Sequence, residues 1–130
     1  MNLLAIVLAG HFIGDWIVQT DRQAANKADS WWSNQDHMLT YHLTMWTMFL
    51  VACLIRGETD ETYLALQHDL FIIMAVSWVT HSIIDRRWPV IWLMEHTGSA
   101  PFSKTHWGPM AVDQALHLGI LTFMVAAVAG

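Results

Sequence analysis

Three histidine–aspartate pairs stand out in this chain, because each lies within a hydrophobic segment at a spacing of four residues. The pairs are His11 with Asp15, His81 with Asp85, and Asp113 with His117. A spacing of four places both side chains on one face of a helix, one turn apart. A fourth hydrophobic segment carries His42. Imidazole and carboxylate together suit divalent transition metals. Polar groups in apolar helices are costly, which makes them candidates for function.

The composition favours a membrane protein over a soluble one. The 130 residues are 55% hydrophobic and only 13% charged, whereas soluble domains carry about a quarter charged residues. The net charge of -5 provides no basic surface, so we expect no nucleic-acid partner. Cys53 is the only cysteine, which excludes a disulfide framework and a thiolate metal cluster.

Four hydrophobic segments predict an all-α integral membrane four-helix bundle, in a single four-span domain over residues 1–130. The predicted spans are roughly 3–19, 37–55, 63–88 and 110–129. Segments of about this length cross a bilayer core, and helices are expected because open strand edges cannot be satisfied in lipid. The predicted connections are a polar loop at 20–36, an acidic link at 57–62 and a longer stretch at 89–108. A soluble four-helix bundle is the alternative, and the low charge content disfavours it.

Basic residues predict the orientation of these helices. Five of them fall in the connections after the first and third segments: Arg22, Lys27, Arg86, Arg87 and Lys104. Only Arg56 falls on the opposite side. The positive-inside rule therefore places the two connections in the cytoplasm and both termini on the non-cytoplasmic side. Six tryptophans cluster at the same boundary, as in an aromatic belt: Trp16, Trp31, Trp32, Trp88, Trp92 and Trp107.

The order within each pair changes with the direction of its helix. His11 and His81 precede their aspartates in helices that run toward the cytoplasm, whereas Asp113 precedes its histidine in a helix that runs away. At about 1.5 Å per residue, the carboxylates lie roughly 5–6 Å inside the helix ends, the imidazoles roughly 10–12 Å and His42 roughly 7–8 Å. The pattern predicts an Asp layer above a His layer, in a pocket that opens toward the cytoplasm.

The predicted metal ligands are His11, Asp15, His42, His81, Asp85, Asp113 and His117. These seven exceed the four ligands of one tetrahedral zinc ion. Either one ion is bound and further Asp-to-His hydrogen bonds surround it, or two ions share the pocket. Zinc is the first expectation, and iron or manganese are alternatives. An aspartate that is not a ligand, Asp15 or Asp113, would act as a general base.

Other polar residues carry weaker signals. His37 stands at the mouth of the second span and does not share a face with His42, which suits a gate or an interfacial residue. His68 lies far from the pocket, and His96 and His106 are expected to be solvated loop residues that could fold over it. Two glutamines neighbour the site and could orient its ligands or a water: Gln19 and Gln114.

These motifs resemble the small four-span membrane proteins of bacteria and their phages classed as domain-of-unknown-function family 3307. The resemblance rests on HFIGDWIVQT at 11–20, His42, HSIID at 81–85 and DQALH at 113–117, and only 89–108 is unremarkable. It implies that the family's recurring polar positions fall on these residues, and that the protein lies in the bacterial inner (plasma) membrane. The chain is also distantly similar to proteins labelled membrane-bound metal-dependent hydrolases.

Three functions remain open at this point. The first is a membrane metalloprotein, expected to be a hydrolase of a lipid or lipid-linked substrate that uses the metal to activate water. The second is a proton or metal-ion conduit, although the other half of the bundle offers few polar residues. The third is an assembly or cofactor-binding subunit, for example one that holds haem between two histidines. A structural polar network is the remaining alternative. The expected partners are membrane lipid and either a homo-oligomer or a larger membrane assembly.

Overall fold

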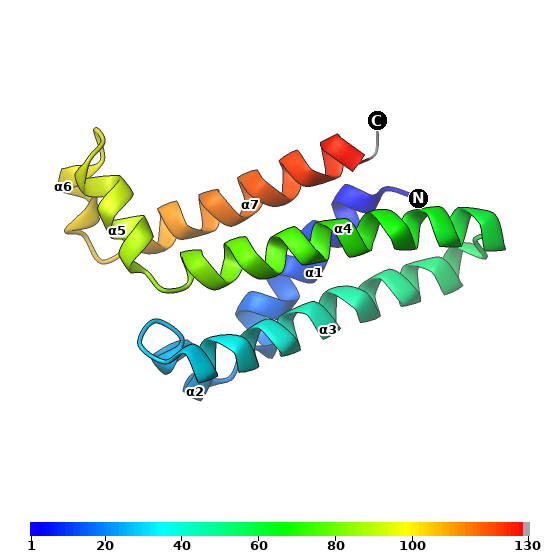
Figure 1. Cartoon of the computed structure of the whole chain (residues 1–130), viewed down its shortest axis with the longest axis horizontal. Helices are drawn as coiled ribbons and strands as arrows, with labels where there is room; N and C mark the ends of the chain where they lie inside the picture. Colours follow the sequence, from blue (N-terminus) through cyan, green and yellow to red (C-terminus); the bar gives the residue numbers. More distant parts are fainter. Residues whose placement is uncertain (129–130) are drawn as a thin grey trace.

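The structure, a computed structural model, describes residues 1–128, and its regular secondary structure is entirely helical over that range. The elements in chain order are α1 (Leu3–Phe12), the π-helix η1 (Ile13–Val18), α2 (Asp21–Asn26), α3 (Trp31–Arg56), α4 (Asp60–Ile84), α5 (Trp88–Glu95), α6 (Ala100–Ser103) and α7 (Gly108–Val128). The bundle is formed by α1 with η1, α3, α4 and α7. Within it, α1 packs against α3, and α4 packs against both α3 and α7 (Figure 1).

The helix directions agree with the sequence prediction. The start of α1 and the end of α7 lie toward the end of the bundle where α3 turns into α4, whereas α2, α5 and α6 lie at the opposite end (Figure 1). As a result, α1 and α4 run toward α2, α5 and α6, and α7 runs away from them. The two connections that contain the five basic residues therefore share one end of the molecule.

Three helices are long and apolar enough to cross a membrane: α3 with 26 residues, α4 with 25 and α7 with 21. Leu3–Val18, which joins α1 and η1, forms a shorter apolar helix. The outer faces of these helices expose large hydrophobic side chains, among them Ile17, Leu54, Ile55, Leu64 and Phe123. Apolar surface of this extent is typical of a protein that contacts lipid or a partner.

Local capping explains the helix boundaries that differ from the predicted ones. α3 begins at Trp31 rather than at residue 37, because the Ser30 side chain accepts a hydrogen bond from the Ser33 N–H and caps the helix. The predicted loop at 20–36 also contains α2, which starts with a reciprocal capping box between Thr20 and Gln23. α4 ends at Ile84 rather than at residue 88, and Pro89 lies in the first turn of α5 instead of ending α4. The predicted connection at 89–108 is thus largely helical, in α5 and α6.

The first helix changes from α to π geometry at the residues that approach the polar site. The sequence pattern does not predict η1, which contains Gly14 and Asp15; π-helices are rare and frequently occur at functional sites. Gly10 and Gly14 allow this helix to lie close to α3. A Cβ on Gly10 would be 3.1 Å from the Met45 Cα, and one on Gly14 would be 3.0 Å from the Tyr41 Cδ2. Small residues four apart commonly permit such close packing in membranes.

An apolar core fills the end of the bundle that lies away from α2. Its buried members are Leu3, Val7, Tyr41, Met45, Phe49, Cys53, Leu70, Ile73, Leu121 and Val125. The buried polar side chains of residues 1–128 come instead from the end of α1, η1, α2, the first half of α3, the last turns of α4 with Asp85, and the middle of α7. The core therefore closes one end of the polar region.

The close approach at Gly10 can be tested against another helical glycine of this chain. We expect Gly10→Val to destabilise the protein by about 1–3 kcal/mol, because the added atoms collide with the backbone of Met45. Gly119→Val is the control, since nothing lies within 4 Å of a Cβ at Gly119. Thermal unfolding in detergent measures both. Equal losses of stability in the two variants would contradict close packing of α1 on α3.

Candidate metal centre

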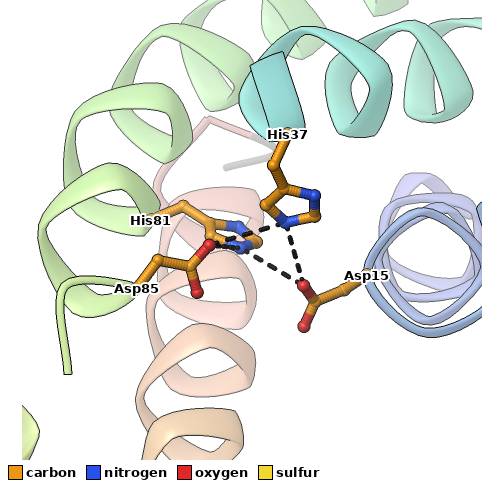
Figure 2. Close-up of side chains that lie close together, drawn as sticks. All are labelled: Asp15, His37, His81 and Asp85. Carbon is orange, nitrogen blue, oxygen red and sulfur yellow. Dashed lines mark hydrogen bonds and ion pairs between the residues drawn. The ribbon is translucent and has the colours of Figure 1, made fainter. Parts of the chain in front are cut away.

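Four buried side chains from three segments of the bundle converge in the polar region. Asp15 comes from η1, His37 from α3, His81 from α4, and Asp85 from the residue that follows α4 (Figure 2). Each offers a donor atom, and the four atoms lie within 4.8 Å of one another. The exposed fraction of these side chains is 4% or less. A small buried space is thus surrounded by two imidazoles and two carboxylates.

The nitrogen–oxygen distances within this group are close to those between the ligand atoms of a metal ion. His37 Nε2 lies 3.1 Å from Asp15 Oδ1 and 3.5 Å from Asp85 Oδ2. His81 Nε2 lies 3.7 Å from the same Asp15 oxygen and 3.4 Å from the same Asp85 oxygen. Donor atoms about 2.0–2.1 Å from a tetrahedral zinc ion are roughly 3.3–3.4 Å apart. The four nitrogen–oxygen distances, 3.1–3.7 Å, lie on either side of this value.

Several polar atoms of this group lack hydrogen-bond partners among residues 1–128. Both ring nitrogens of His81 and both carboxylate oxygens of Asp85 are buried without a hydrogen bond of good geometry. Asp85 Oδ1 does lie 3.1 Å from the Lys27 ammonium. Nδ1 and Nε2 of His117 are in the same state. Buried polar atoms are nearly always paired, because leaving them unpaired costs free energy. A bound cation would satisfy donor atoms of this type.

A second layer of imidazoles lies beside the four-residue group. The ring centroids of His11, His81 and His117 are 3.9–5.9 Å apart. In two further sets the donor atoms also lie within 4.8 Å of one another: His11 with Asp15 and His117, and Asp85 with Asp113 and His117. In the second set, Asp113 Oδ2 is 3.4 Å from His117 Nδ1. The aspartates and histidines of the three predicted pairs thus form one continuous cluster.

A hydrogen-bond network holds Asp15 in place. Gln114 Nε2 donates to Asp15 Oδ2 at 2.8 Å, and this leaves Oδ1 to face His37 and His81. The Gln114 Oε1 atom accepts from His11 Nε2 at 3.0 Å and from Trp16 Nε1 at 3.2 Å. With Nε2 donating, His11 Nδ1 is left to accept from the Tyr41 hydroxyl at 3.0 Å. Gln114 is thus bonded directly to Asp15 and to His11. Contacts of this kind would orient Asp15 if it bound a metal.

Lys27 supplies a positive charge to the cluster from the turn that follows α2. Its Nζ lies 3.2 Å from Asp15 Oδ1 and 3.1 Å from Asp85 Oδ1, and its side chain is only 16% exposed. Burial by itself lowers the pKa of Lys27, but the carboxylates of Asp85 and Asp15 outweigh that effect and raise it above its ordinary value. Lys27 is therefore a charged ammonium that balances part of the buried negative charge.

The cluster borders a cavity of about 500 Å³. Asp15, Asp85 and Asp113 line it, together with Lys27, Arg87 and His106. Its remaining lining residues come mainly from η1, the α2 region and the first turns of α7. The ligand cluster is thus accessible from a space large enough for a small charged group.

The structure brings together six of the seven residues predicted as ligands, all except His42. His42 lies on another face of α3, where its Nδ1 donates to the Met38 carbonyl at 2.8 Å and its ring stacks on Trp78. His37, which was expected to be a gate or an interfacial residue, joins the cluster instead. Ser30 is the signal that could have identified it, because a cap at residue 30 places His37 inside α3 rather than at its mouth.

The other weakly assigned residues divide between the cavity and the surface. Gln19 lines the cavity, and its Oε1 is buried without a partner among the described residues. His106 also lines it, so it lies over the site rather than only in solvent. His96 stacks on Trp92, and His68 is exposed beside Asp69. In the sequence, Lys27 served only to predict which side of the membrane the connections face. The Thr20–Gln23 capping box is the only signal for α2, the helix that places Lys27 next to Asp15.

The fold and the site define an all-helical protein with apolar outer faces and a buried histidine–aspartate cluster that could hold a metal ion. The chain belongs to the family described as "Protein of unknown function (DUF3307)", whose model matches residues 3–129. The family expected from the motifs is thereby confirmed. No match was found among curated proteins or among solved structures.

The role of Lys27 can be measured by comparison with an exposed ion pair. We expect Lys27→Met to destabilise the protein in the presence of chelator by about 3–5 kcal/mol, because two buried carboxylates lose their cation. Arg22→Met is the control, since its exposed pair with Asp36 is worth about 1 kcal/mol or less. Chemical unfolding followed by tryptophan fluorescence gives both values. A loss for Lys27→Met no larger than that of the control would contradict the assigned role.

Proposed function

We propose that this protein is an integral membrane metalloprotein with four spans, and that it acts as a metal-dependent hydrolase on a lipid or lipid-linked substrate. The observation that carries the metal site is the convergence of four buried donor atoms, from Asp15, His37, His81 and Asp85, with nitrogen–oxygen distances of 3.1–3.7 Å. Zinc is the metal that we assign, because a set of two imidazoles and two carboxylates at this spacing suits it.

The surface and the distribution of charge support a membrane location. Large hydrophobic side chains cover the outer faces of α3, α4 and α7, and water would not favour so much exposed apolar surface. The polar cluster lies toward the end that holds α2, α5 and α6 and the connections with five basic residues. We infer that this end faces the cytoplasm and that both termini face the other side.

Charge balance favours one metal ion rather than two. Asp15, Asp85 and Asp113 together carry three negative charges, and one divalent ion with the Lys27 ammonium supplies three positive charges. A second divalent ion would leave a net positive charge in a buried space, which is unfavourable. His11 and His117 then support the ligands instead of binding a second ion.

We assign separate roles to the two aspartates considered as bases. Both oxygens of Asp15 have neighbours, Gln114 on one and His37, His81 and Lys27 on the other, so Asp15 is a ligand. Asp113 is less buried, lines the cavity and contacts His117, so we assign it as the general base. A divalent ion in the site would polarise the substrate and promote deprotonation of a water. Asp113 receives the proton from that water.

The alternatives are less compatible with the packing. A conduit needs polar groups along the whole bundle, but the apolar core around Val7, Phe49 and Ile73 closes one end of the polar region. A haem held between two histidines needs space for a macrocycle. His81 and His117 have ring centroids only 3.9 Å apart, and His11 packs against both.

Two histidines of α3 provide a matched test of the metal site. We expect purified wild-type protein to contain about one zinc ion per chain, His37→Ala to lose it, and His42→Ala to retain it, because only His37 joins the donor set. Asp113→Asn should also retain the metal. Elemental analysis of detergent-purified protein, with circular dichroism to show that each variant is folded, measures this. Metal-free wild-type protein, or loss in His42→Ala with retention in His37→Ala, would refute the proposed site.

A further inference from the structure

The cavity beside the metal centre is also lined by two basic side chains that take no part in the metal site. Arg87 and His106 line it and are exposed at its rim. Neither side chain makes a hydrogen bond or an ion pair with residues 1–128. Lys27 lines the cavity closer to the ligands. An ammonium has three N–H donors, and its two carboxylate contacts leave one for a further group.

The backbone at Arg87 is held in an unusual conformation. Its φ is 64°, and it is the only residue other than glycine with a positive φ among the described residues. Such a conformation is costly for a residue with a Cβ, and it persists where the surroundings or a function require it. The neighbouring Arg86 has ordinary structural contacts, because it lies over the Trp31 ring and reaches the carbonyls of Lys27 and Asp29. The two arginines therefore differ: one is bound to the protein, and the other is free at the cavity.

One wall of the cavity is apolar and exposed. It includes Trp16 from η1, which is 56% exposed, and Met110 from α7, which is 41% exposed. Ile17, next to Trp16, is 76% exposed. A ligand that fits this space therefore has a charged head, bound among the cations, and an apolar part that leaves along the exposed wall.

We propose that the cavity binds the phosphate monoester head of a membrane lipid, and that Arg87 is the residue that recognises its phosphoryl oxygens. A guanidinium offers paired N–H donors that match phosphate geometry, and Lys27 adds a donor beside the metal ligands. Three aspartates around the same space would repel a phosphate dianion unless a divalent ion balanced them. The inference thus rests on the proposed metal site and requires phosphate binding to depend on the metal.

The reaction that follows from this substrate is balanced without a further reagent. The oxygen of one water forms a bond to phosphorus, and the bond between phosphorus and the lipid oxygen breaks. Asp113 takes a proton from the water and returns a proton to the departing lipid oxygen. The products are a lipid alcohol and inorganic phosphate.

The test uses zinc-loaded protein in nanodiscs and two phosphate probes. Inorganic phosphate is titrated by calorimetry into protein in phosphatidylcholine nanodiscs, and phosphatidic acid is included in a second set of nanodiscs that is followed by ³¹P NMR. Arg87→Gly removes the guanidinium and accepts the positive φ without strain, and Arg87→Asn is a second variant that tolerates this conformation. Arg22→Gly removes an arginine that lies away from the cavity.

We expect the phosphatidic acid resonance to broaden and inorganic phosphate to be released slowly, while the phosphodiester signal of phosphatidylcholine is unchanged. Both Arg87 variants should bind phosphate about tenfold more weakly or worse with unchanged zinc content, and Arg22→Gly should behave as wild type. Chelator should abolish binding.

Equal phosphate affinity in wild type and both Arg87 variants would overturn this inference and leave the metal site intact, as would binding of inorganic phosphate without any effect on phosphatidic acid. Absence of zinc from the wild type would instead refute the proposed function.

Discussion

The negative charge of Asp15 and Asp85, buried between helices, is the constraint on which the rest of this structure depends. Two carboxylates this close cannot remain charged in a low-dielectric interior unless cations balance them. Lys27 contacts one oxygen of each, and the imidazoles of His37 and His81 approach the same oxygen of Asp15 and the other oxygen of Asp85. Donor atoms of the two imidazoles and the two carboxylates lie within 4.8 Å of one another, so the group could hold a metal ion. The proposed ion would neutralise the negative charge of the carboxylates that Lys27 leaves unbalanced.

Several unusual features of the backbone serve this arrangement. Gly10 and Gly14 bring the first helix close to α3, and the change to π geometry in η1 occurs at the residues that present Asp15. α4 ends just before Asp85, and Arg87, which has a positive φ, precedes the first residue of α5. Each feature is locally less favourable than a regular helix, and Asp15, Asp85 and Arg87 line the cavity as a result. The apolar core at the other end of the bundle supplies the packing that tolerates them.

The sequence predicts most of this cluster, because a spacing of four within an apolar helix allows little choice of face. The inverted order of Asp113 and His117 correctly indicates that three helices contribute to one pocket. The choice between His37 and His42 depends on where α3 begins, and a single cap at Ser30 decides it. Lys27 reaches Asp15 only through the short turn of α2, and the π-helix and the conformation of Arg87 depend on tertiary packing. The spacing of polar and apolar residues along the chain does not reveal these tertiary contacts.

X-ray absorption spectroscopy at the zinc edge, on the purified wild-type protein, tests the central claim most directly. The account predicts a first shell of four nitrogen and oxygen atoms at about 2.0–2.1 Å, with the outer-shell scattering of two imidazole rings. A spectrum with no imidazole scattering, or with six oxygen neighbours as in hydrated zinc, would show that Asp15, His37, His81 and Asp85 do not hold the metal. In that case the cluster would be a polar network that Lys27 balances alone.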